Sequence, residues 1–447
     1  MTLQPDSELA QAATRIARRL QEAGFQAFWV GGSVRDLLLG REPGDYDIAT
    51  SALTDQVESL FPKTIPVGKK FGVVIVREPP FEFQVATFRA ESDYRDGRRP
   101  EEVQFGDPRA DALRRDFTVN GLFYDPVAGE LRDWVGGGPD LKAQILRTIG
   151  NPDERFGEDY LRMLRAVRLA ARLGFAIEEG TMASVQRNAQ LITRTSPERI
   201  RDELIKLLRP PHAARGLELL RESGLIGHVL PEIAATITCE QSPDFHPEGS
   251  VFNHIKLMLQ HLPADADPSL PWAALLHDVA KPLTASRDPL TGTIHFSAHE
   301  WVGAEMTEVI LTRLRFPRRQ IDEIVTAVRG HMRFKDAPQM RQSTLRRMLL
   351  EPTFPLELQL HRLDCLGSHG RLGIYDYLIE QKLQLEQQPA LLPPLVTGRD
   401  LMDQGVAPGP EMGRLLSRIR DLQLQEELHT SEQALAWLRK ELGSDPR

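Results

Sequence analysis

Hydrophobic and polar residues follow two different periods along the chain. In the first 150 residues an amphipathic stretch at 9–23 has the spacing of a helix, and short apolar stretches have the length and composition of strands. These expected strands are 25–30, 46–49, 71–76, 82–88 and 122–124. From about 153 to 227 strand patterns stop and helical spacing dominates, beginning with "GEDYLRMLRAVRLAARLGF". The pattern therefore predicts a mixed α/β head followed by an all-helical region.

Two polar segments that contain proline predict further boundaries. The segment "CEQSPDFHPEGS" (239–250) precedes a histidine-rich block, and "LEQQPALLPPLVTG" (385–398) precedes a short tail with several glycines and a helical pattern. We therefore expect an α+β multidomain chain. Its parts would be a head at 1–150, a helical neck at 151–238, a helical domain at 245–385 and a helical tail at 395–447.

Composition excludes several classes of protein. The 447-residue chain is 41% hydrophobic, and no stretch approaches the roughly 18 unbroken apolar residues of a membrane span. The N-terminus lacks the apolar run of a signal peptide, so we expect a cytoplasmic protein without membrane contact. Cys239 and Cys365 lie far apart without metal-type spacing, which argues against a disulfide framework or a zinc knuckle.

Charge is unevenly distributed. The net charge of -8 argues against a chain that coats nucleic acid with its whole surface. Residues 155–209, however, contain 11 Lys or Arg against 7 Asp or Glu, a local excess of four positive charges. A basic patch that binds a nucleotide or RNA is therefore compatible with the sequence.

The stretch "WVGGSVRDLLLGREPGDYDIATS" (29–51) combines a glycine pair with two aspartates. Gly31 and Gly32 stand between a strand pattern and a helix pattern, where backbone N–H groups can approach a phosphate. In a strand, Asp45 and Asp47 would project to one face, and paired carboxylates of this kind commonly hold Mg²⁺. The alternative is a tight turn with two solvated aspartates.

Two later motifs supply hydrogen-bonding groups at helical spacing. In "RRDFTVNGLFYDP" (114–126), Asp116 and Asn120 are one helical turn apart and suit ribose hydroxyls. In "GEDYLRMLRAVR", the acceptors Glu158 and Asp159 share a helix face with the donor Arg162, as recognition of a base edge requires. A plain salt bridge on a helix surface is the alternative for this trio.

Taken in order, these motifs resemble the class II tRNA nucleotidyltransferase and bacterial poly(A) polymerase family over about residues 25–230. The resemblance rests on GGSVRD, GDYDIATS, RRDFTVNGLFYDP, RFGEDYLRMLRAVRLAARLGF and SPERIRDEL (196–204). It implies that Gly31, Gly32 and Arg35 belong to a triphosphate-binding turn. It also implies that Asp45 and Asp47 hold the catalytic Mg²⁺ ions.

The same resemblance assigns the later residues. Asp116 and Asn120 would contact the ribose, and Arg115 would reach phosphate. An EDxxR motif would pair with the Watson–Crick edge of the incoming CTP or ATP, and a neighbouring basic face would bind triphosphate or the tRNA end. The motif residues are Glu158, Asp159 and Arg162, and the basic residues are Arg165 and Arg168.

One position departs from the family pattern. Family members often carry Glu in the strand before "TFR", whereas this chain reads "FEFQVATFR" with Gln84 there. A neutral amide cannot act as a third anionic metal ligand. Glu82 stands on the same strand face and is either a substitute or a surface residue.

The middle of the chain contains histidines and aspartates in the order H, HD, H, H, D, which resembles the HD phosphohydrolase superfamily over about residues 245–370. The resemblance implies a first metal site at His254, His277, Asp278 and Asp364, and a second at His299 and His331. Such ligands suit Mn²⁺, Ni²⁺, Fe²⁺ or Mg²⁺. The domain is either a phosphohydrolase or phosphodiesterase or a helical support for tRNA, and we place His295 and His369 on the surface.

The expected function is addition or repair of the 3′-terminal CCA of tRNA from CTP and ATP, with release of pyrophosphate. An A-adding enzyme, a CC-adding enzyme and a poly(A) polymerase remain alternatives, because EDxxR does not separate them. The loop at 89–111 would affect the change from C to A. Another alternative is a metal phosphohydrolase with an RNA-binding head. The tail resembles either a helix-hairpin-helix that contacts RNA or a helical cap.

Overall fold

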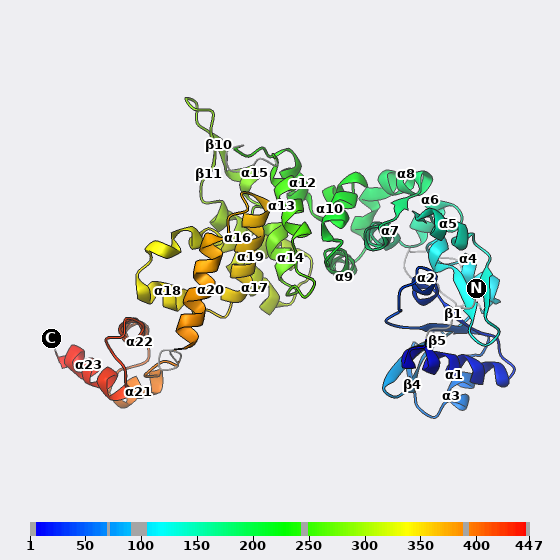
Figure 1. Cartoon of the computed structure of the whole chain (residues 1–447), viewed down its shortest axis with the longest axis horizontal. Coiled ribbons are helices and arrows are strands. Elements are labelled where there is room, and N and C mark those ends of the chain that lie inside the picture. Colours follow the sequence, from blue (N-terminus) through cyan, green and yellow to red (C-terminus); the bar gives the residue numbers. More distant parts are fainter. Residues whose placement is uncertain (1–5, 69–71, 91–104, 243–248, 388–392, 444–447) are drawn as a thin grey trace. The chain divides into compact units, whose positions relative to one another are not determined.

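The computed structural model describes residues 6–68, 72–90, 105–242, 249–387 and 393–443. The chain divides into two compact units, Met1–Pro231 and Glu232–Arg447 (Figure 1). Of the helices that the structure describes, none has both the length and the apolar content needed to cross a membrane. The first unit contains the sheet and the second is mainly helical, which confirms the expected α+β class.

A seven-stranded sheet forms the head, in the order β3-β4-β5-β2-β1-β6-β7. Strand β2 pairs with β5 in parallel, with Ile48 opposite Val85, and the other pairings are antiparallel. The strands are β1 (Ala27–Val30), β2 (Asp47–Thr50), β3 (Thr64–Gly68), β4 (Val73–Glu78), β5 (Phe81–Thr87), β6 (Leu122–Asp125) and β7 (Glu130–Asp133).

Strand β1 is buried on both faces, which explains its unbroken apolar sequence. Ala27 and Trp29 belong to the core that includes the apolar face of helix α1 (Glu8–Glu22). Phe28 and Val30 belong to a second core with Phe88 and Phe123. Burial of β1 on both sides therefore fixes the chain just before the Gly31–Gly32 turn.

Most expected elements of the head are present. The helix expected at 9–23 is α1, and the strands expected near 25, 46, 82 and 122 are β1, β2, β5 and β6. The strand expected at 71–76 is β4, although residue 71 lies outside the described residues. The sequence pattern missed β3 and β7, because β7 is exposed throughout and β3 is a five-residue stretch that contains a proline and has only two apolar residues, Ile65 and Val67.

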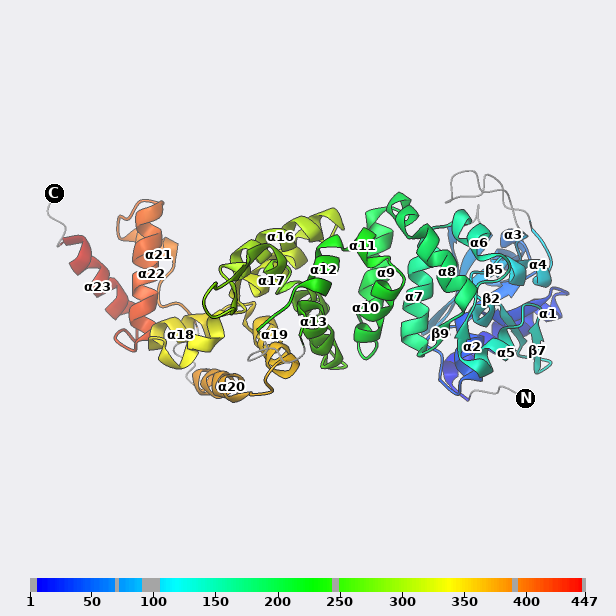
Figure 2. The same cartoon turned by 90° about the horizontal axis from the view of Figure 1, so that it is seen from above.

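Short helices connect the sheet to the functional segments. They are α2 (Gly32–Leu38), α3 (Thr54–Leu60), α4 (Pro108–Leu113), the 3₁₀ helix η2 (Thr118–Asn120) and α5 (Gly137–Ala143). The remaining helices of the first unit are α6 (Pro152–Glu158), α7 (Leu161–Leu173), α8 (Glu179–Asn188), η3 (Ala189–Arg194), α9 (Pro197–Leu207), α10 (Ala213–Glu222) and α11 (Ile226–Val229). Helix α7 lies beside both α9 and α10 (Figure 2).

The helical region is not free of strands, and the expectation of none from 153 to 227 was wrong. Strand β9 (Ala176–Ile177) pairs in parallel with β8 (Ile145–Leu146). Each strand is two residues long, so neither presents a repeat that sequence periodicity can detect.

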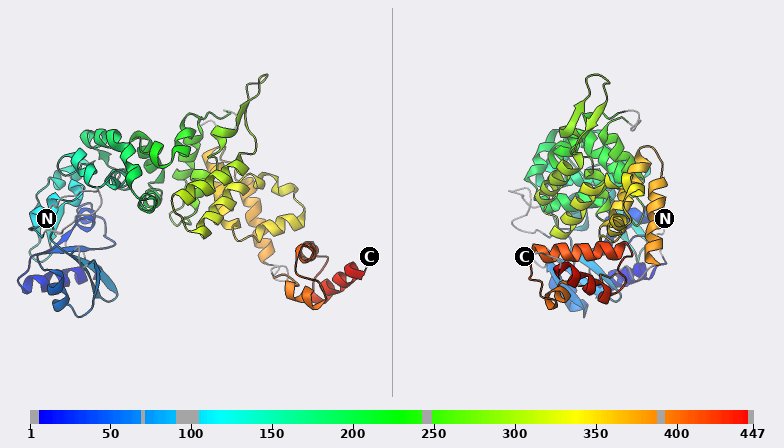
Figure 3. Two further views of the ribbon diagram at one scale, coloured as in Figure 1. Left: turned by 180° about the vertical axis from the view of Figure 1, so that it is seen from behind. Right: turned by 90° about the vertical axis from the view of Figure 1, so that its left-hand side faces the viewer.

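The second unit consists of helices around the histidine-rich segments, with one hairpin that projects from them (Figure 3). The hairpin joins β10 (Ala285–Arg287) to β11 (Ile294–Phe296). The helices up to the hairpin are α12 (Pro231–Ala235), η4 (Thr236–Thr238), α13 (Val251–Gln260), α14 (Leu270–Leu276) and α15 (Lys281–Thr284). After it come α16 (His299–Arg313), α17 (Arg318–Gly330), η5 (Arg333–Gln339), α18 (Gln342–Leu349), α19 (Phe354–Gly367) and α20 (Gly373–Glu386).

The tail contains α21 (Gly398–Asp403), α22 (Pro410–Leu424) and α23 (Ser431–Gly443), which share an apolar core of their own. Arg346 of α18 donates a hydrogen bond to the carbonyl of Leu424, at the end of α22. The helical tail expected from 395 onward is therefore present.

Candidate functional site

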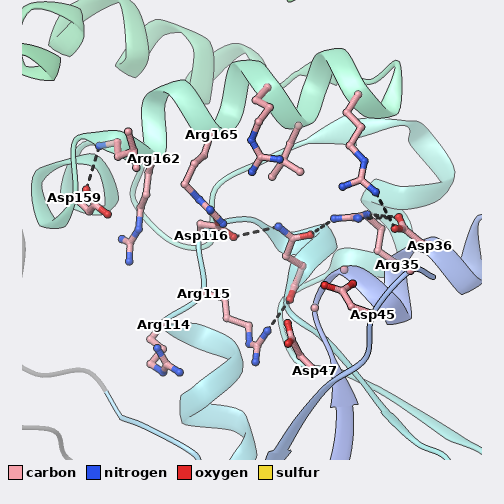
Figure 4. A pocket seen from close by; sticks show the side chains of 18 of the residues that line it. Arg35, Asp36, Asp45, Asp47, Arg114, Arg115, Asp116, Asp159, Arg162 and Arg165 are labelled. Atoms are coloured by element: carbon pink, nitrogen blue, oxygen red, sulfur yellow. Dashed lines mark hydrogen bonds and ion pairs between the residues drawn. The ribbon is translucent and has the colours of Figure 1, made fainter. Parts of the chain in front are cut away.

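A cavity of about 820 Å³ lies in the first unit, between the head and helices α7 and α9 (Figure 4). Twelve of the thirteen residues expected at the head site line it. Among the residues that the structure describes, Glu158 is the expected site residue that does not line the cavity. In Figure 4, Arg162 and Arg165 extend from α7 toward the side where Asp45 and Asp47 lie.

The Gly31–Gly32 turn leaves room for two guanidinium groups. Gly31 has a φ of +74°, and a Cβ atom there would stand 3.1 Å from Nη1 of Arg115. A Cβ atom on Gly32 would stand 3.4 Å from Nη2 of Arg35. Gly31 is therefore needed for the positive φ and for close packing of Arg115 against the turn, whereas a Cβ atom on Gly32 would make an ordinary contact with Arg35.

Arg35 lines the cavity, although it is only 3% exposed. Its Nη1 donates to Oδ1 of Asn120 at 2.5 Å, and its Nη2 pairs with Oδ1 of Asp36 at 2.7 Å. Burial lowers the pKa of Arg35, although the adjacent Asp36 opposes that effect. In this structure Arg35 holds Asn120 and Asp36 in place.

Asp45 and Asp47 are both exposed and line the cavity, whereas Tyr46 between them is buried in the core. Strand β2 begins at Asp47, so Asp45 lies in the segment that precedes the strand. The two exposed carboxylates nevertheless alternate with the buried Tyr46, as expected. Desolvation by the surrounding protein atoms and repulsion from Asp45 raise the pKa of Asp47, although its side chain keeps contact with solvent. Two close carboxylates that repel each other are a donor set that fits Mg²⁺.

Asp116 and Asn120 are in contact, but they do not lie on one α-helix as expected. Asp116 is in a turn and Asn120 ends η2, and Nδ2 of Asn120 donates to Oδ1 of Asp116 at 3.2 Å. Nη2 of Arg165 pairs with Oδ2 of Asp116 at 2.6 Å. Burial alone would raise the pKa of the Asp116 carboxyl, but Arg165 and Asn120 hold it below its usual value.

The two arginines that precede Asp116 share one carboxylate. Nη2 of Arg115 lies 3.0 Å from Oδ2 of Asp111, and Nη2 of Arg114 lies 2.5 Å from Oδ1. Arg115 also lies over the ring of Phe123, 5.0 Å from its centroid. Both arginines line the cavity, although only Arg115 was expected there.

The EDxxR motif spans a break between two helices. Glu158 ends α6, Asp159 has an extended backbone, and α7 begins at Leu161. The expectation of a continuous helix face was therefore wrong. Glu158 forms ion pairs with Arg155 and Arg162, while Asp159 and Arg162 line the cavity. The motif thus divides into a supporting residue and two residues that face the open space.

A row of arginines continues along α7. Arg165, Arg168 and Arg172 all line the cavity at the three- and four-residue spacing of one helix face. Arg168 pairs with Glu203 of α9 at 2.5 Å, and Arg172 lies 3.4 Å from Asp36. Sequence reasoning missed Arg172, although its spacing from Arg168 was a usable signal.

Arg199 and Asp36 were also missed, and both stand in motifs that were recognised. Arg199 belongs to "SPERIRDEL" and pairs with Asp159 at 2.7 Å. Asp36 belongs to "GGSVRD". Both residues line the cavity; Arg199 pairs with Asp159, and Asp36 lies near Arg172 of α7 in addition to pairing with the adjacent Arg35.

Neither of the two β5 residues discussed above belongs to the cavity lining that the structure describes. Glu82 and Gln84 are exposed on one face of β5, as their spacing predicts. Glu82 pairs with Arg77 of the neighbouring strand at 2.7 Å. Glu82 is therefore engaged at the surface. The loop that was expected to affect the C-to-A change lies mostly outside the described residues, at 91–104.

The second unit contains two adjoining groups of candidate metal ligands that share Asp278. One group is His254, His277 and Asp278, and the other is Asp278, His299 and His331. In each group the ligand atoms lie within 4.8 Å of one another, and all the residues are buried. Asp364, expected in the first site, lies beside it, with Oδ1 3.0 Å from Nε2 of His254.

The four histidines are oriented in a common way that fits metal binding. Nδ1 of each faces a backbone carbonyl: Gly367 for His254, Ala274 for His277, Phe296 for His299 and Val328 for His331. Because a carbonyl only accepts, Nδ1 carries the proton and Nε2 keeps the lone pair that a metal needs. These residues therefore fit one or two divalent ions.

Charge within this cluster is balanced by a lysine. Nζ of Lys281 lies 2.7 Å from Oδ2 of Asp278 and 2.6 Å from Oε1 of Gln241. Burial would raise the pKa of Asp278, but His277 and Lys281 hold it well below the usual value. Burial lowers the pKa of His331 to about 4. His295 and His369 are exposed, as expected.

Three segments of the chain match models of known families. Residues 27–147 match the poly A polymerase head domain, residues 174–237 match the probable RNA and SrmB-binding site of polymerase A, and residues 250–364 match the HD domain. The first match includes the cavity residues from Gly31 to Asn120 and the second includes Arg199, whereas α7 lies between the two matched ranges. The third includes both groups of candidate metal ligands.

Several relatives are CCA-adding enzymes. That of Bacillus cytotoxicus is 32% identical over 434 residues, 95% of this chain and 97% of that protein. That of Geobacillus kaustophilus is 46% identical over 228 residues, 51% of this chain and 56% of that protein, so this match spans about half the relative's length. The same holds for other Geobacillus relatives.

Solved structures extend the similarity to the fold. The CCA-adding enzyme of Bacillus stearothermophilus in complex with CTP has a TM-score of 0.74 and 29% identity over 98% of each chain. The Thermotoga maritima CCA-adding enzyme complexed with tRNA has the same fold, with a TM-score of 0.56 and 22% identity over 98% of this chain and 96% of that one. Because the Bacillus cytotoxicus relative is similar over nearly its whole length, the chain belongs to the nucleotidyltransferase family of CCA-adding enzymes and bacterial poly(A) polymerases, and it carries an HD domain.

Proposed function

We propose that the chain adds or repairs the 3′-terminal CCA of tRNA from CTP and ATP and releases pyrophosphate. The observation that carries this proposal is one cavity lined both by the carboxylates Asp45 and Asp47 and by the pair Asp159 and Arg162. A metal-binding pair and a base-reading pair in one space suit a polymerase that selects nucleotides without a nucleic-acid template. The name and the bound CTP of the Bacillus stearothermophilus structure support this assignment.

In the proposed reaction Asp45 and Asp47 hold Mg²⁺. Mg²⁺ held there would supply Lewis-acid activation of the RNA 3′-hydroxyl, which attacks the α-phosphate, and charge stabilisation of the pyrophosphate that leaves. Arg165, Arg168 and Arg172 of α7 attract and orient the triphosphate. Their carboxylate partners fix the guanidinium groups before the substrate arrives, so little reorganisation is required.

Asp159 and Arg162 explain the choice of nucleobase. Cytosine and adenine each present an amino donor beside a ring nitrogen that accepts, whereas uracil and guanine present a carbonyl where the amino group would be. A carboxylate that only accepts and a guanidinium that only donates complement the first pattern and reject the second. Glu158, which does not line the cavity, forms an ion pair with Arg162 and restrains its guanidinium group.

Four functional regions are part of the proposal. The head at 1–150 performs the transfer, and the neck at 151–238 selects the nucleotide and holds the tRNA end. The HD region at 245–385 and the tail at 395–447 complete a cytoplasmic enzyme. Gly31, Gly32 and Arg115 border the triphosphate, and Asp116 and Asn120 border the ribose.

The proposal is tested with tRNA transcripts that end before CCA or after CC, and with an unrelated RNA. Each is incubated with Mg²⁺ and labelled CTP or ATP. Incorporation of C and A that stops after three residues supports CCA addition, whereas A alone, C alone or long A tails assign a narrower family activity. No incorporation by the parent protein favours a phosphohydrolase with an RNA-binding head. Asp45→Ala/Asp47→Ala must abolish incorporation.

A second activity is favoured by the two ligand groups that share Asp278. We propose that the HD region binds Mn²⁺, Ni²⁺, Fe²⁺ or Mg²⁺ and hydrolyses phosphate esters, because the histidine Nε2 atoms are left available for metal. Metal content and hydrolysis of a phosphomonoester and a 2′,3′-cyclic nucleotide are measured in the parent, in His277→Ala and in Asp278→Ala. A parent that binds metal but hydrolyses neither substrate would contradict the proposed activity.

A further inference from the structure

Helix α9 contacts the nucleotide-selecting end of α7 through one charged face. Arg199 and Glu203 are four residues apart on α9 and therefore lie on the same face. Nη2 of Arg199 pairs with Oδ2 of Asp159 at 2.7 Å, and Oε2 of Glu203 accepts from Nε of Arg168 at 2.5 Å. One face of α9 thus holds both the base-reading carboxylate and a cation of the proposed triphosphate site.

Asp159 needs outside support because it lies in the break between α6 and α7. Its backbone is extended, with φ −154° and ψ 104°. Two hydrogen bonds fix the plane of its carboxylate: Oδ1 accepts from the backbone N–H of Leu161 at 3.1 Å, and Oδ2 accepts from Arg199. Without Arg199, only the bond from Leu161 would restrain the carboxylate among the bonds that the structure describes.

The ion pair has a second consequence for specificity. A carboxylate oxygen can accept two hydrogen bonds, so each oxygen of Asp159 retains capacity for the amino group of cytosine or adenine. Arg199 also lines the cavity, and a guanidinium left free there would offer donors to the carbonyl of uracil or guanine. Pairing with Asp159 both aligns the acceptor and engages Nη2 of Arg199.

We propose that Arg199 is a positioning residue for nucleotide selection, which aligns the Asp159 carboxylate so that the enzyme accepts CTP and ATP and rejects UTP and GTP. This inference rests on the proposed function. It gives the segment "SPERIRDEL" a role in nucleotide selection. The ion pair of Glu203 with Arg168 would by itself indicate only that this segment supports α7.

The test compares Arg199→Met with the parent enzyme in single-turnover addition to tRNA that lacks CCA. The ratio of kcat/KM for CTP to that for UTP is expected to fall roughly 10- to 100-fold, because a charge-assisted hydrogen bond and the alignment it provides are lost. Arg199→Lys, which keeps a donor, should restore part of the ratio. Arg201→Met is the matched control, since Arg201 is on the same helix and pairs with Asp202.

A double variant separates positioning from general support of the fold. In an Asp159→Ala background there is no carboxylate to align, so Arg199→Met should cause no further fall in kcat/KM for CTP. A parental CTP-to-UTP ratio in Arg199→Met, or an equal loss for both nucleotides, would overturn the inference. Additive losses in the double variant would overturn it as well. If the parent enzyme incorporates no C, the proposed function fails instead.

Discussion

At the scale of single residues, the cavity concentrates positive charge only because carboxylates neutralise part of it. The carboxylates come from different elements, and each holds a guanidinium group in a fixed orientation. The pairs are Arg115–Asp111, Arg165–Asp116, Arg168–Glu203, Arg172–Asp36 and Arg199–Asp159. Arginines held in this way are ready to receive a triphosphate without a large loss of side-chain entropy.

Asp116 makes part of this arrangement sensitive to pH. Its pKa in the folded protein lies below the ordinary value of about 3.9, so its stabilising effect is complete above about pH 4 and is lost as the pH falls through the folded pKa. Asp116→Asn should lower the free energy of unfolding at pH 7 by roughly 2 kcal/mol, less than for a fully buried pair because Arg165 is partly exposed.

Calorimetry of the parent and variant between about pH 3 and pH 7 checks this expectation. The difference in the free energy of unfolding between the parent and the variant should become smaller in acid, where the Asp116 carboxyl of the parent becomes protonated. A difference that stays constant at every pH would contradict the assignment. Asp202→Asn serves as the control, because its side chain is exposed and its removal should change stability little.

Gly31 permits a second test at the residue scale. In Gly31→Ala, the new Cβ atom meets Arg115 at 3.1 Å on a backbone with φ +74°. We expect Arg115 to move and the KM for nucleotide to rise roughly tenfold, because small displacements in a binding site have large effects. Gly40→Ala is a matched control: its φ is +70°, but nothing lies within 4 Å of the added atom. If the KM for nucleotide rose equally in both variants, backbone strain and not contact with Arg115 would be the cause.

Local spacing was sufficient to place most of the site residues, but it did not identify their partners. Asp45 and Asp47 alternate around a buried tyrosine, and the EDxxR motif is compact, so both can be recognised from the chain alone. The ion pair between Asp159 and Arg199 joins residues 40 positions apart. Such partners depend on how α7 and α9 pack, which a single sequence does not specify.

At the scale of elements, packing of α9 against α7 fixes the wall of the cavity. Glu203 is buried and stands between Arg168 and Arg165. The apolar periodicity of both helices predicted their existence, and charged residues on their facing surfaces determine their register. Strands β3 and β7 were missed because they offer little apolar signal: β3 contains a proline and β7 is exposed throughout.

Glu203→Gln should therefore destabilise the first unit. The change leaves the partly buried Arg168 without the charge of the buried Glu203, and breaking such a pair costs about 3 kcal/mol. Urea unfolding of the full chain measures this loss. Glu222→Gln, which breaks the exposed pair between Arg215 and Glu222, should lower stability by less than about 1 kcal/mol. If the two changes lowered the free energy of unfolding equally, burial of Glu203 would not explain the contribution of its ion pair to stability.

At the scale of the whole molecule, the chain combines two sets of metal-type ligands, one in each compact unit. The head presents carboxylates to an open basic cavity, as suits a charged and exchangeable substrate. The second unit presents imidazoles and one shared carboxylate in a buried group, as suits tighter coordination of a divalent ion. The different ligand chemistry argues for two sites with separate metal requirements.

We expect variants of the two sites to separate their activities. Asp45→Ala/Asp47→Ala should abolish nucleotide addition and leave the metal content of the HD region unchanged, because these ligands belong to different units. His277→Ala/Asp278→Ala should remove that metal and preserve addition to tRNA lacking CCA. Metal analysis by mass spectrometry and the addition assay, both on the full chain, measure the two effects. His369→Ala, at an exposed histidine outside the ligand groups, is the control. Loss of nucleotide addition in the HD double variant, with metal retained in the head, would instead indicate that the reaction depends on both units.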